Sequence, residues 1–399
     1  MATDFTVDRD TVKYVLNSSG DISSVAIDTP AIEYNTDGTY KGLLVEPAST
    51  NICKQSEDIG TTWGTGNATP TAVTDETPDG DTSSKYIKLA DDNTGGGATG
   101  SVYILQTITV VGGAQYTASA FLKKDGLDWA RLQAFATGGT DNSPGQYFDL
   151  DTGALGSATA GIQDATIEAY PNGWYRCSMT WTQGAGDTSF QFAVLVAEAD
   201  NDTTVDLDGT SSIFVWGAQV EASPIATSYI PTTTASVTRN KDDINLTGAS
   251  DLIGQGEGTL YVEVDWRRAS GQTQGLLFVS GTATPNENRI QIEVNDPTSN
   301  LSMIVRISGT TEVFQGQSFS GYSGIQKIAF AYANQDFELY RNGSSISSNT
   351  AGSLAALGTL TVIDLGQSYN ASQQANMWIR AVALYKTRLT DDQLADLTS

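Results

Sequence analysis

The chain contains no histidine, so any catalysis would have to run on its carboxylates. Glu263 and Asp265 form the strongest pair, because alternate positions of a strand place both side chains on one face. A pair of carboxylates flanking the scissile bond is what glycoside hydrolysis requires. The further carboxylate expected on this strand is missing, since Arg267 and Arg268 stand in its place. We therefore interpret the pair as a solvated strand face and expect no catalytic residue.

A second acidic motif, Asp151-Thr152-Gly153, matches the tripeptide of aspartic proteases. That chemistry needs two aspartates sharing one proton, the second supplied by a matching motif or by a dimer partner. The sequence contains no second copy of the motif. The segment from Asp149 to Gly153 is therefore predicted to be a hairpin turn that follows the Tyr147-Phe148 strand.

Four aspartates gather in one short stretch, at Asp200, Asp202, Asp206 and Asp208. Carboxylate oxygens are the ligands that calcium prefers. The spacing is not that of an EF-hand, because Ser211 stands where the bidentate glutamate would be. Two interpretations remain: a bound Ca²⁺, which would be the one cofactor of the chain, and an acidic loop exposed to solvent.

Aromatic side chains offer a different chemistry, because the apolar face of a sugar ring packs on an indole or phenol ring while its hydroxyls bind nearby polar groups. Trp129, Tyr147 and Trp181 are our candidates for glycan binding, with burial in the core as the alternative for each. Trp174 and Trp216 alternate with small or apolar neighbours and are predicted to lie in the core.

The charge of the chain restricts its partners. A count of 21 Lys and Arg against 46 Asp and Glu gives a net charge of −25, which repels nucleic acid and anionic membrane surfaces. No apolar run approaches the ~18 residues of a spanning helix, and the N-terminus lacks the features of a signal peptide. We expect cytoplasmic synthesis, with Cys53 and Cys177 reduced.

The composition predicts an all-β protein, because 40 glycines and few charged residues suit short strands joined by turns. Alternation is clearest in Leu260 to Trp266, where Leu260, Val262 and Val264 share one face. Asn342-Gly343 predicts a type I′ hairpin turn. Only the end of the chain is predicted to be helical, with Thr390 as N-cap and Leu394 and Leu397 on one face. Further strands are expected at 102–110, 116–123, 129–135, 174–182, 189–196, 213–220, 290–294, 303–307, 328–332 and 337–341.

The segment 228–234 contains Pro231 and is predicted to be an extended linker or edge segment. We place a domain boundary near Asn240. The expected organisation is a β lead-in segment over 1–45, a first β-sandwich over 46–240 and a second β-sandwich over 241–399 that a short helix closes.

A series of short motifs in the first 240 residues resembles a family of bacteriophage virion proteins found in tail fibres, tail spikes and head fibres. The resemblance implies a jelly roll similar to carbohydrate-binding modules. The motifs occur in the order of that family; they are Gly42-Leu43-Leu44-Val45-Glu46, Thr50-Asn51, Ser56-Glu57-Asp58 with Trp63, Pro78-Asp79-Gly80, Tyr116-Thr117-Ala118-Ser119, Phe148-Asp149-Leu150-Asp151-Thr152-Gly153, Asn172-Gly173-Trp174-Tyr175-Arg176, Gly217-Ala218-Gln219-Val220-Glu221-Ala222 and Thr227-Ser228-Tyr229-Ile230-Pro231-Thr232.

The remainder of the chain, from about Ile244, resembles the concanavalin A-like (laminin G-like) fold. The resemblance rests on Gly258-Thr259-Leu260, on Leu339-Tyr340-Arg341-Asn342-Gly343 and on Ile379-Arg380-Ala381-Val382-Ala383-Leu384-Tyr385 with Leu389-Thr390. This fold carries lectins, glycan hydrolases and purely structural modules, so it does not specify a function.

These resemblances imply a non-enzymatic structural protein of the virion surface, a tail-fibre or receptor-binding adhesin that contacts host-surface glycan. The alternatives are a capsid, neck or tail decoration protein without glycan binding, and a polysaccharide depolymerase. The expected partners are other virion proteins and host glycan, and the resemblance to phage fibres suggests a homotrimer.

Overall fold

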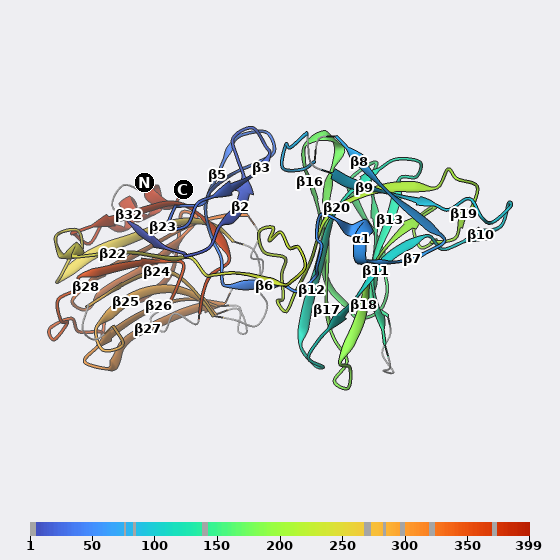
Figure 1. Cartoon of the computed structure of the whole chain (residues 1–399). Helices are drawn as coiled ribbons and strands as arrows, with labels where there is room; N and C mark the ends of the chain where they lie inside the picture. Colours follow the sequence, from blue (N-terminus) through green and yellow to red (C-terminus); the bar gives the residue numbers. More distant parts are fainter. Residues whose placement is uncertain are drawn as a thin grey trace.

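The chain folds into two β-sandwiches that lie side by side (Figure 1). The expected fold class is confirmed: the protein is all-β, with two sandwiches of antiparallel strands and a short C-terminal helix. No helix among the described residues is both long and apolar enough to cross a membrane. The computed structural model describes residues 5–75, 77–82, 85–137, 143–266, 273–281, 285–295, 300–318, 324–368 and 373–399.

The first sandwich consists of two six-stranded sheets that enclose a common core. Sheet I has the order β15 (Ala154–Ala158), β14 (Gly145–Asp149), β13 (Trp129–Ala136), β18 (Ser189–Ala197), β11 (Tyr103–Thr109) and β7 (Gly64–Gly66). Sheet II has the order β16 (Ile162–Ala169), β17 (Tyr175–Thr182), β12 (Gln115–Lys124), β20 (Ser212–Glu221), β9 (Lys85–Asp91) and β8 (Ala68–Thr74). Smaller elements complete it: α1 (Ile59–Thr62), η1 (Pro171–Gly173) and the pair of β10 (Thr99–Gly100) with β19 (Val205–Asp206).

The second sandwich consists of two seven-stranded sheets around a separate core. Sheet III has the order β1 (Thr6–Asp8), β22 (Asp243–Thr247), β31 (Val362–Leu365), β24 (Thr273–Ser280), β25 (Arg289–Asn295), β26 (Asn300–Ile307) and β27 (Thr310–Ser318). Sheet IV has the order β30 (Ser344–Asn349), β29 (Asp336–Arg341), β28 (Ile325–Ala333), β23 (Glu257–Trp266), β32 (Met377–Tyr385), β5 (Tyr40–Val45) and β4 (Ile32–Tyr34). The other elements are η2 (Ala249–Asp251) and the C-terminal helix α2 (Asp391–Thr398).

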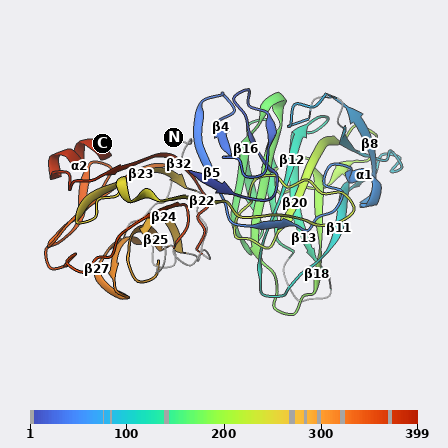
Figure 2. The ribbon, with the colours of Figure 1, turned by 60° about the vertical axis from the view of Figure 1, so that its left-hand side comes forward.

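The first 45 residues supply strands to the second sandwich, although they precede the first one in the chain. β1 pairs with β22, and β5 pairs with β32. Figure 2 shows β4 and β5 in blue at the side of the second sandwich that faces the first. The chain thus begins in the second sandwich, leaves it after Val45 to form the first, and returns at Asp243. The segment 1–45, expected to be a lead-in to the first sandwich, therefore contributes β1 to sheet III and β4 and β5 to sheet IV of the second sandwich.

The passage between the sandwiches is a two-stranded ribbon beside a buried group of charges. The ribbon pairs β6 (Ser49–Asn51) with β21 (Val237–Arg239). Asp242 binds the Arg9 guanidinium at 2.8 Å and the Lys13 ammonium at 2.6 Å, and Lys13 also lies 3.1 Å from Glu46. Arg239 lies 3.5 Å from Glu46, and all five side chains are at most 1% exposed.

A hairpin of the N-terminal segment packs on the outer face of sheet II. Its strands are β2 (Lys13–Leu16) and β3 (Ile22–Val25), and Leu16 and Ile22 contact an aromatic cluster that includes Trp174 and Trp216. Both tryptophans are buried, which confirms their predicted place in the core. The cluster that buries them lies between the hairpin and sheet II and not between the two sheets.

Local predictions for the C-terminal part are confirmed. Leu260, Val262 and Val264 lie in the core of the second sandwich. Asn342 and Gly343 have φ values of 47° and 80°, as a type I′ turn requires. Thr390 caps α2, because its side chain accepts a hydrogen bond from the Gln393 amide. The ten further strands expected from the sequence are found as β11, β12, β13, β17, β18, β20, β25, β26, β28 and β29. Eight of them lie within one residue of the predicted ends, whereas β26 and β28 each begin three residues earlier than predicted.

The two cysteines are buried free thiols, as predicted. Burial raises the pKa of the Cys53 and Cys177 thiols well above the ordinary value, because a thiolate would lose its hydration. The reactive form of each side chain is therefore suppressed.

Candidate functional site

The outer face of sheet I presents a row of large side chains along β13. Ala130, Leu132 and Ala134 point into the core and are at most 1% exposed, so the alternate positions must face outward. These outward positions are Trp129, Arg131, Gln133 and Phe135. The predicted strand 129–135 therefore carries one candidate, Trp129, together with three residues of the same face that the sequence analysis did not select.

A hollow of about 560 Å³ lies on this face, and we call it the sheet I hollow. The rings of Tyr103 and Phe135 stand on either side of β18, with centroids 6.4 Å apart and planes at 57°. Gln133 and Gln191 add amides, and Arg131 adds a guanidinium. The described residues that line the hollow are Ser101, Tyr103, Leu105, Arg131, Gln133, Phe135, Ala136, Gln191, Leu195 and Thr203.

Two glycines on neighbouring strands make room for side chains of the hollow. Gly66 pairs with Tyr103, and a Cβ atom on Gly66 would lie 2.2 Å from the Tyr103 ring. A Cβ atom on Gly145 would lie 2.7 Å from two nitrogens of the Arg131 guanidinium. Side chains at these positions would displace the ring and the guanidinium, so the missing Cβ atoms are part of the geometry of the hollow.

Tyr147 supports Arg131 from the adjacent strand. The two residues are paired in register, the guanidinium lies 4.9 Å from the Tyr147 ring centroid, and its Nη1 is 3.4 Å from the Tyr147 hydroxyl. Tyr147 is only 3% exposed, so its ring holds Arg131 and offers no free face for stacking. Trp129 is half-buried at the end of the same row, beside Gly156 and the Asp200 carboxylate.

The interpretation of Trp181 as a sugar platform is wrong. Its side chain is 1% exposed and packs in the core, with its ring centroid 5.1 Å from that of Phe190 and 6.2 Å from that of Tyr116. The indole N–H donates to Gln183 at 2.9 Å, which satisfies its one polar group. No face of this ring is left for a ligand.

The four aspartates of the predicted calcium loop do not converge. Asp200 accepts hydrogen bonds from the amide and hydroxyl of Ser157 on β15, and Asp202 accepts one from the Thr204 amide. Asp208 accepts two from Thr210, which lower the pKa of the Asp208 carboxyl.

Asp206, like the other three, is exposed. Among the described residues, no group of three or more Asp, Glu, Cys or His side chains is placed to hold a metal ion. The structure therefore corresponds to the second interpretation, an acidic exposed loop. This loop still contributes to the site, because its Thr203 lines the sheet I hollow.

The other acidic motifs have structural roles. Glu263 on β23 forms an ion pair with Arg380 at 2.9 Å and accepts a hydrogen bond from Tyr261 at 3.3 Å. Its neighbour Asp265 is half-buried on the same strand. Arg267 and Arg268 stand where a catalytic strand would carry a further carboxylate, and they lie outside the described residues.

The Asp-Thr-Gly motif forms the turn between β14 and β15, as predicted. Asp149 accepts hydrogen bonds from the amides of Asp151 and Thr152, and Gly153 follows with a φ of 72°. Partial burial opposes the charge of Asp149, but hydrogen bonds from the Thr152 hydroxyl and from these two amides outweigh it and lower the pKa of the Asp149 carboxyl.

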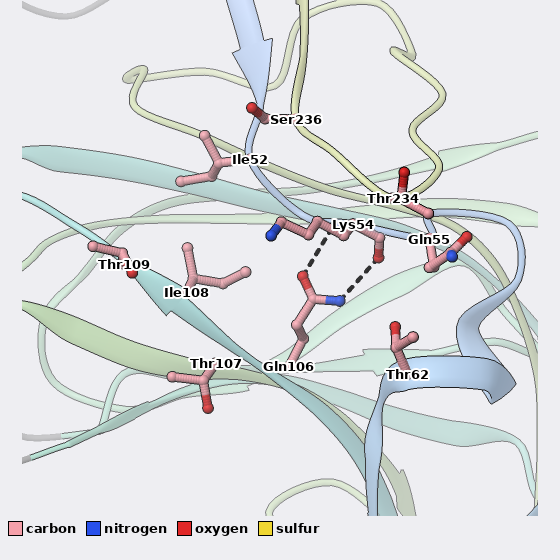
Figure 3. A pocket seen from close by; sticks show the side chains of 10 residues that line it. All are labelled: Ile52, Lys54, Gln55, Thr62, Gln106, Thr107, Ile108, Thr109, Thr234 and Ser236. Atoms are coloured by element: carbon pink, nitrogen blue, oxygen red, sulfur yellow. Dashed lines mark hydrogen bonds between the residues drawn. The ribbon is translucent and has the colours of Figure 1, made fainter.

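A second hollow, of about 520 Å³, lies at the edge of β11 (Figure 3). The Gln106 amide crosses it, accepting from the Lys54 amide at 2.8 Å and donating to the Lys54 carbonyl at 2.9 Å. Its other described lining residues are isoleucines, threonines, a glutamine and a serine, so no aromatic ring faces it. A sugar would find no stacking platform there, and the sheet I hollow is the better candidate site.

Several solved structures are similar to this chain, although no protein-family model and no curated protein matches it. The CBM40 of the Ruminococcus gnavus IT-sialidase is 17% identical with a TM-score of 0.33, over 38% of this chain and 86% of that one. Domain 4 of an extracellular arabinanase from Geobacillus stearothermophilus, in complex with arabinotriose, is 16% identical with a TM-score of 0.33, over 44% and 82%.

A native heptameric SAP-like pentraxin from Limulus polyphemus is 10% identical with a TM-score of 0.31, over 36% of this chain and 70% of that one. Each of these three similarities covers less than half of this chain.

Proposed function

We propose that this chain is a glycan-binding protein of a bacteriophage virion surface, an adhesin that binds host glycan in the sheet I hollow without cleaving it. The observation that carries the proposal is the lining of this hollow. Tyr103 and Phe135 offer rings for a sugar to stack on, and Gln133, Gln191 and Thr203 offer hydrogen-bonding groups around them. The motif series of the first 240 residues supports the assignment to a virion.

Binding without hydrolysis is supported by the types of residue at the site. The described lining residues of the hollow include no carboxylate, and cleavage of a glycosidic bond generally requires two. Glu263, the best carboxylate candidate of the sequence, is held in an ion pair with Arg380. On the virion we propose that the chain assembles with other virion proteins as a homotrimer, which light scattering of the purified protein would test.

Binding of the labelled, purified chain to a glycan array that includes polysaccharides of candidate host bacteria tests the proposal. We expect saturable binding, and we expect Phe135→Ala and Tyr103→Ala each to weaken it by about fivefold, since one aromatic contact is worth roughly 1 kcal/mol. The matched control is Phe314→Ala, because Phe314 is a 60% exposed ring of the other sandwich.

Other outcomes would replace the proposal. If the folded chain bound no glycan and labelled protein decorated the head, a decoration role would follow. New reducing ends after incubation with host polysaccharide would instead establish a depolymerase. If Phe314→Ala weakened binding as strongly as Phe135→Ala, the site would not be the sheet I hollow.

A further inference from the structure

Arg131 is the one charged residue among the described residues that line the sheet I hollow. The chain has more than twice as many acidic as basic residues, and four of its other described arginines have a carboxylate partner within 4.0 Å. Arg9 binds Asp242, Arg380 binds Glu263 and Arg388 binds Asp336. No carboxylate of the described residues lies within 4.0 Å of Arg131, whose partners are the ring and hydroxyl of Tyr147.

The guanidinium of Arg131 is nevertheless held in place. Tyr147 lies against one face of it, and the backbone of Gly145 lies so close that a Cβ atom there would clash with it. Its Nε atom is buried without a hydrogen-bond partner, as are those of Arg239 and Arg388, which nevertheless have carboxylate partners. Arg131 differs from these two because no described carboxylate pairs with its guanidinium. Arg131 is therefore a positioned cation without an anionic partner among the described residues.

We propose that the sheet I hollow recognises a sugar that carries a carboxylate, and that Arg131 binds this carboxylate. The inference rests on the proposed function, and it specifies the class of glycan. The planar fork of a guanidinium matches a carboxylate with two parallel hydrogen bonds. The sugar ring would lie on Tyr103 and Phe135, which stand at the same hollow.

The overall charge of −25 does not oppose this assignment at physiological salt. Interactions between exposed charges are largely screened beyond a Debye length, which is about 8 Å at 0.15 M ionic strength. Arg131 is the one charged group among the described lining residues, although the acidic loop that carries Thr203 adjoins the hollow. A carboxylate in the hollow would meet the Arg131 cation at contact distance.

Calorimetric titration at 0.15 M salt with two pairs of probes tests the inference. The pairs are sialyllactose with lactose, and oligogalacturonate with its carboxyl-reduced form. We expect the intact chain to bind at least one acidic probe about tenfold or more tighter than its neutral counterpart, as a charge-assisted pair implies. Arg131→Gln should remove this preference, and Arg131→Lys should restore only part of it, because lysine keeps the charge without the fork.

The matched control is Lys54→Gln, which removes a cation from the other hollow. It should leave the preference intact, and thermal unfolding should show that all three variants are folded. Equal binding of acidic and neutral probes, or a preference that survives Arg131→Gln, would overturn the inference while the proposed glycan binding stands. Binding of a neutral glycan on the array with no affinity for either acidic probe would overturn it too. Failure of every glycan to bind would overturn both proposals.

Discussion

The surroundings of Asp364 on β31 disfavour the ionised form of its carboxyl group. Its desolvation raises the pKa of the carboxyl to about 6, and the neighbouring Asp243 carboxylate acts in the same direction. A hydrogen bond from Gln367 and the charge of Lys241 act the other way but do not prevail. At neutral pH the folded protein therefore holds a carboxylate that would be more stable in the unfolded chain.

Asp364→Asn should raise the free energy of unfolding at pH 7. The folded pKa of about 6 lies above the value near 3.8 of an ordinary aspartate, so the native state binds more protons between these pH values. The contribution of Asp364 therefore becomes more favourable as pH falls through 6, and at pH 7 its charge costs about 3 kcal/mol. Urea unfolding at pH 7 and pH 4.5 would measure the difference.

The gain from Asp364→Asn should be largest at pH 7 and shrink toward pH 4.5. The control is Asp206→Asn, because Asp206 is exposed on the acidic loop. An equal gain at both pH values would show that the effect comes from packing and not from the charge of Asp364.

Helix α2 covers the outer face of sheet IV and explains why that face is not solvated. Alternation along β23 places Tyr261 on the face opposite to the core, yet Tyr261 is only 6% exposed. The reason is a small apolar cluster in which Leu394 of α2 packs against Tyr261, Ala329 and Tyr340. Burial and the neighbouring Glu263 raise the pKa of Tyr261 to about 12.

Leu394→Ala should therefore destabilise the second sandwich by about 2–5 kcal/mol, because removing most of this fully buried side chain leaves a cavity between α2 and sheet IV. Leu252→Ala is the matched control in the same sandwich, since Leu252 is 50% exposed. Chemical denaturation followed by tryptophan fluorescence measures both variants. If the two variants lost equal stability, α2 would not be packed as a cover on sheet IV.

The sequence predicts the positions of the strands better than it predicts which strands lie next to each other in a sheet. The strand at Trp129 to Phe135 was expected, and its alternation already contains Arg131 and Gln133. The hollow also needs Tyr103 on β11, which adjoins β13 only through β18. That order is set by pairing between segments far apart in the chain, which no local pattern records.

Burial on both faces of a strand explains the error at Trp181. Six consecutive residues of β17, from Arg176 to Trp181, are buried, because sheet I covers one face and other segments cover the opposite face. The segment after β20 is one of these covers: the Thr227 carbonyl accepts a hydrogen bond from Arg176. When both faces are covered, alternation no longer separates a core ring from one that meets a ligand.

At the scale of the whole molecule, the first sandwich is inserted into the second. The second sandwich can form completely only when segments from before and after the insertion meet, as β1 and β22 do. Asp242 lies where the chain returns, and its partners Arg9 and Lys13 come from the N-terminal segment. These buried ion pairs therefore join the two parts of the chain that the insertion separates.

Asp242→Asn should destabilise the protein by about 3–5 kcal/mol, because it leaves Arg9 uncompensated and Lys13 with Glu46 alone in a buried site. Limited proteolysis should then cut the N-terminal segment before the first sandwich, and differential scanning calorimetry should show a lower unfolding temperature. Asp151→Asn provides the control, since its ion pair with Lys124 is exposed and should leave both readouts unchanged. Unaltered unfolding and proteolysis of Asp242→Asn would mean that strand pairing alone holds the two parts together.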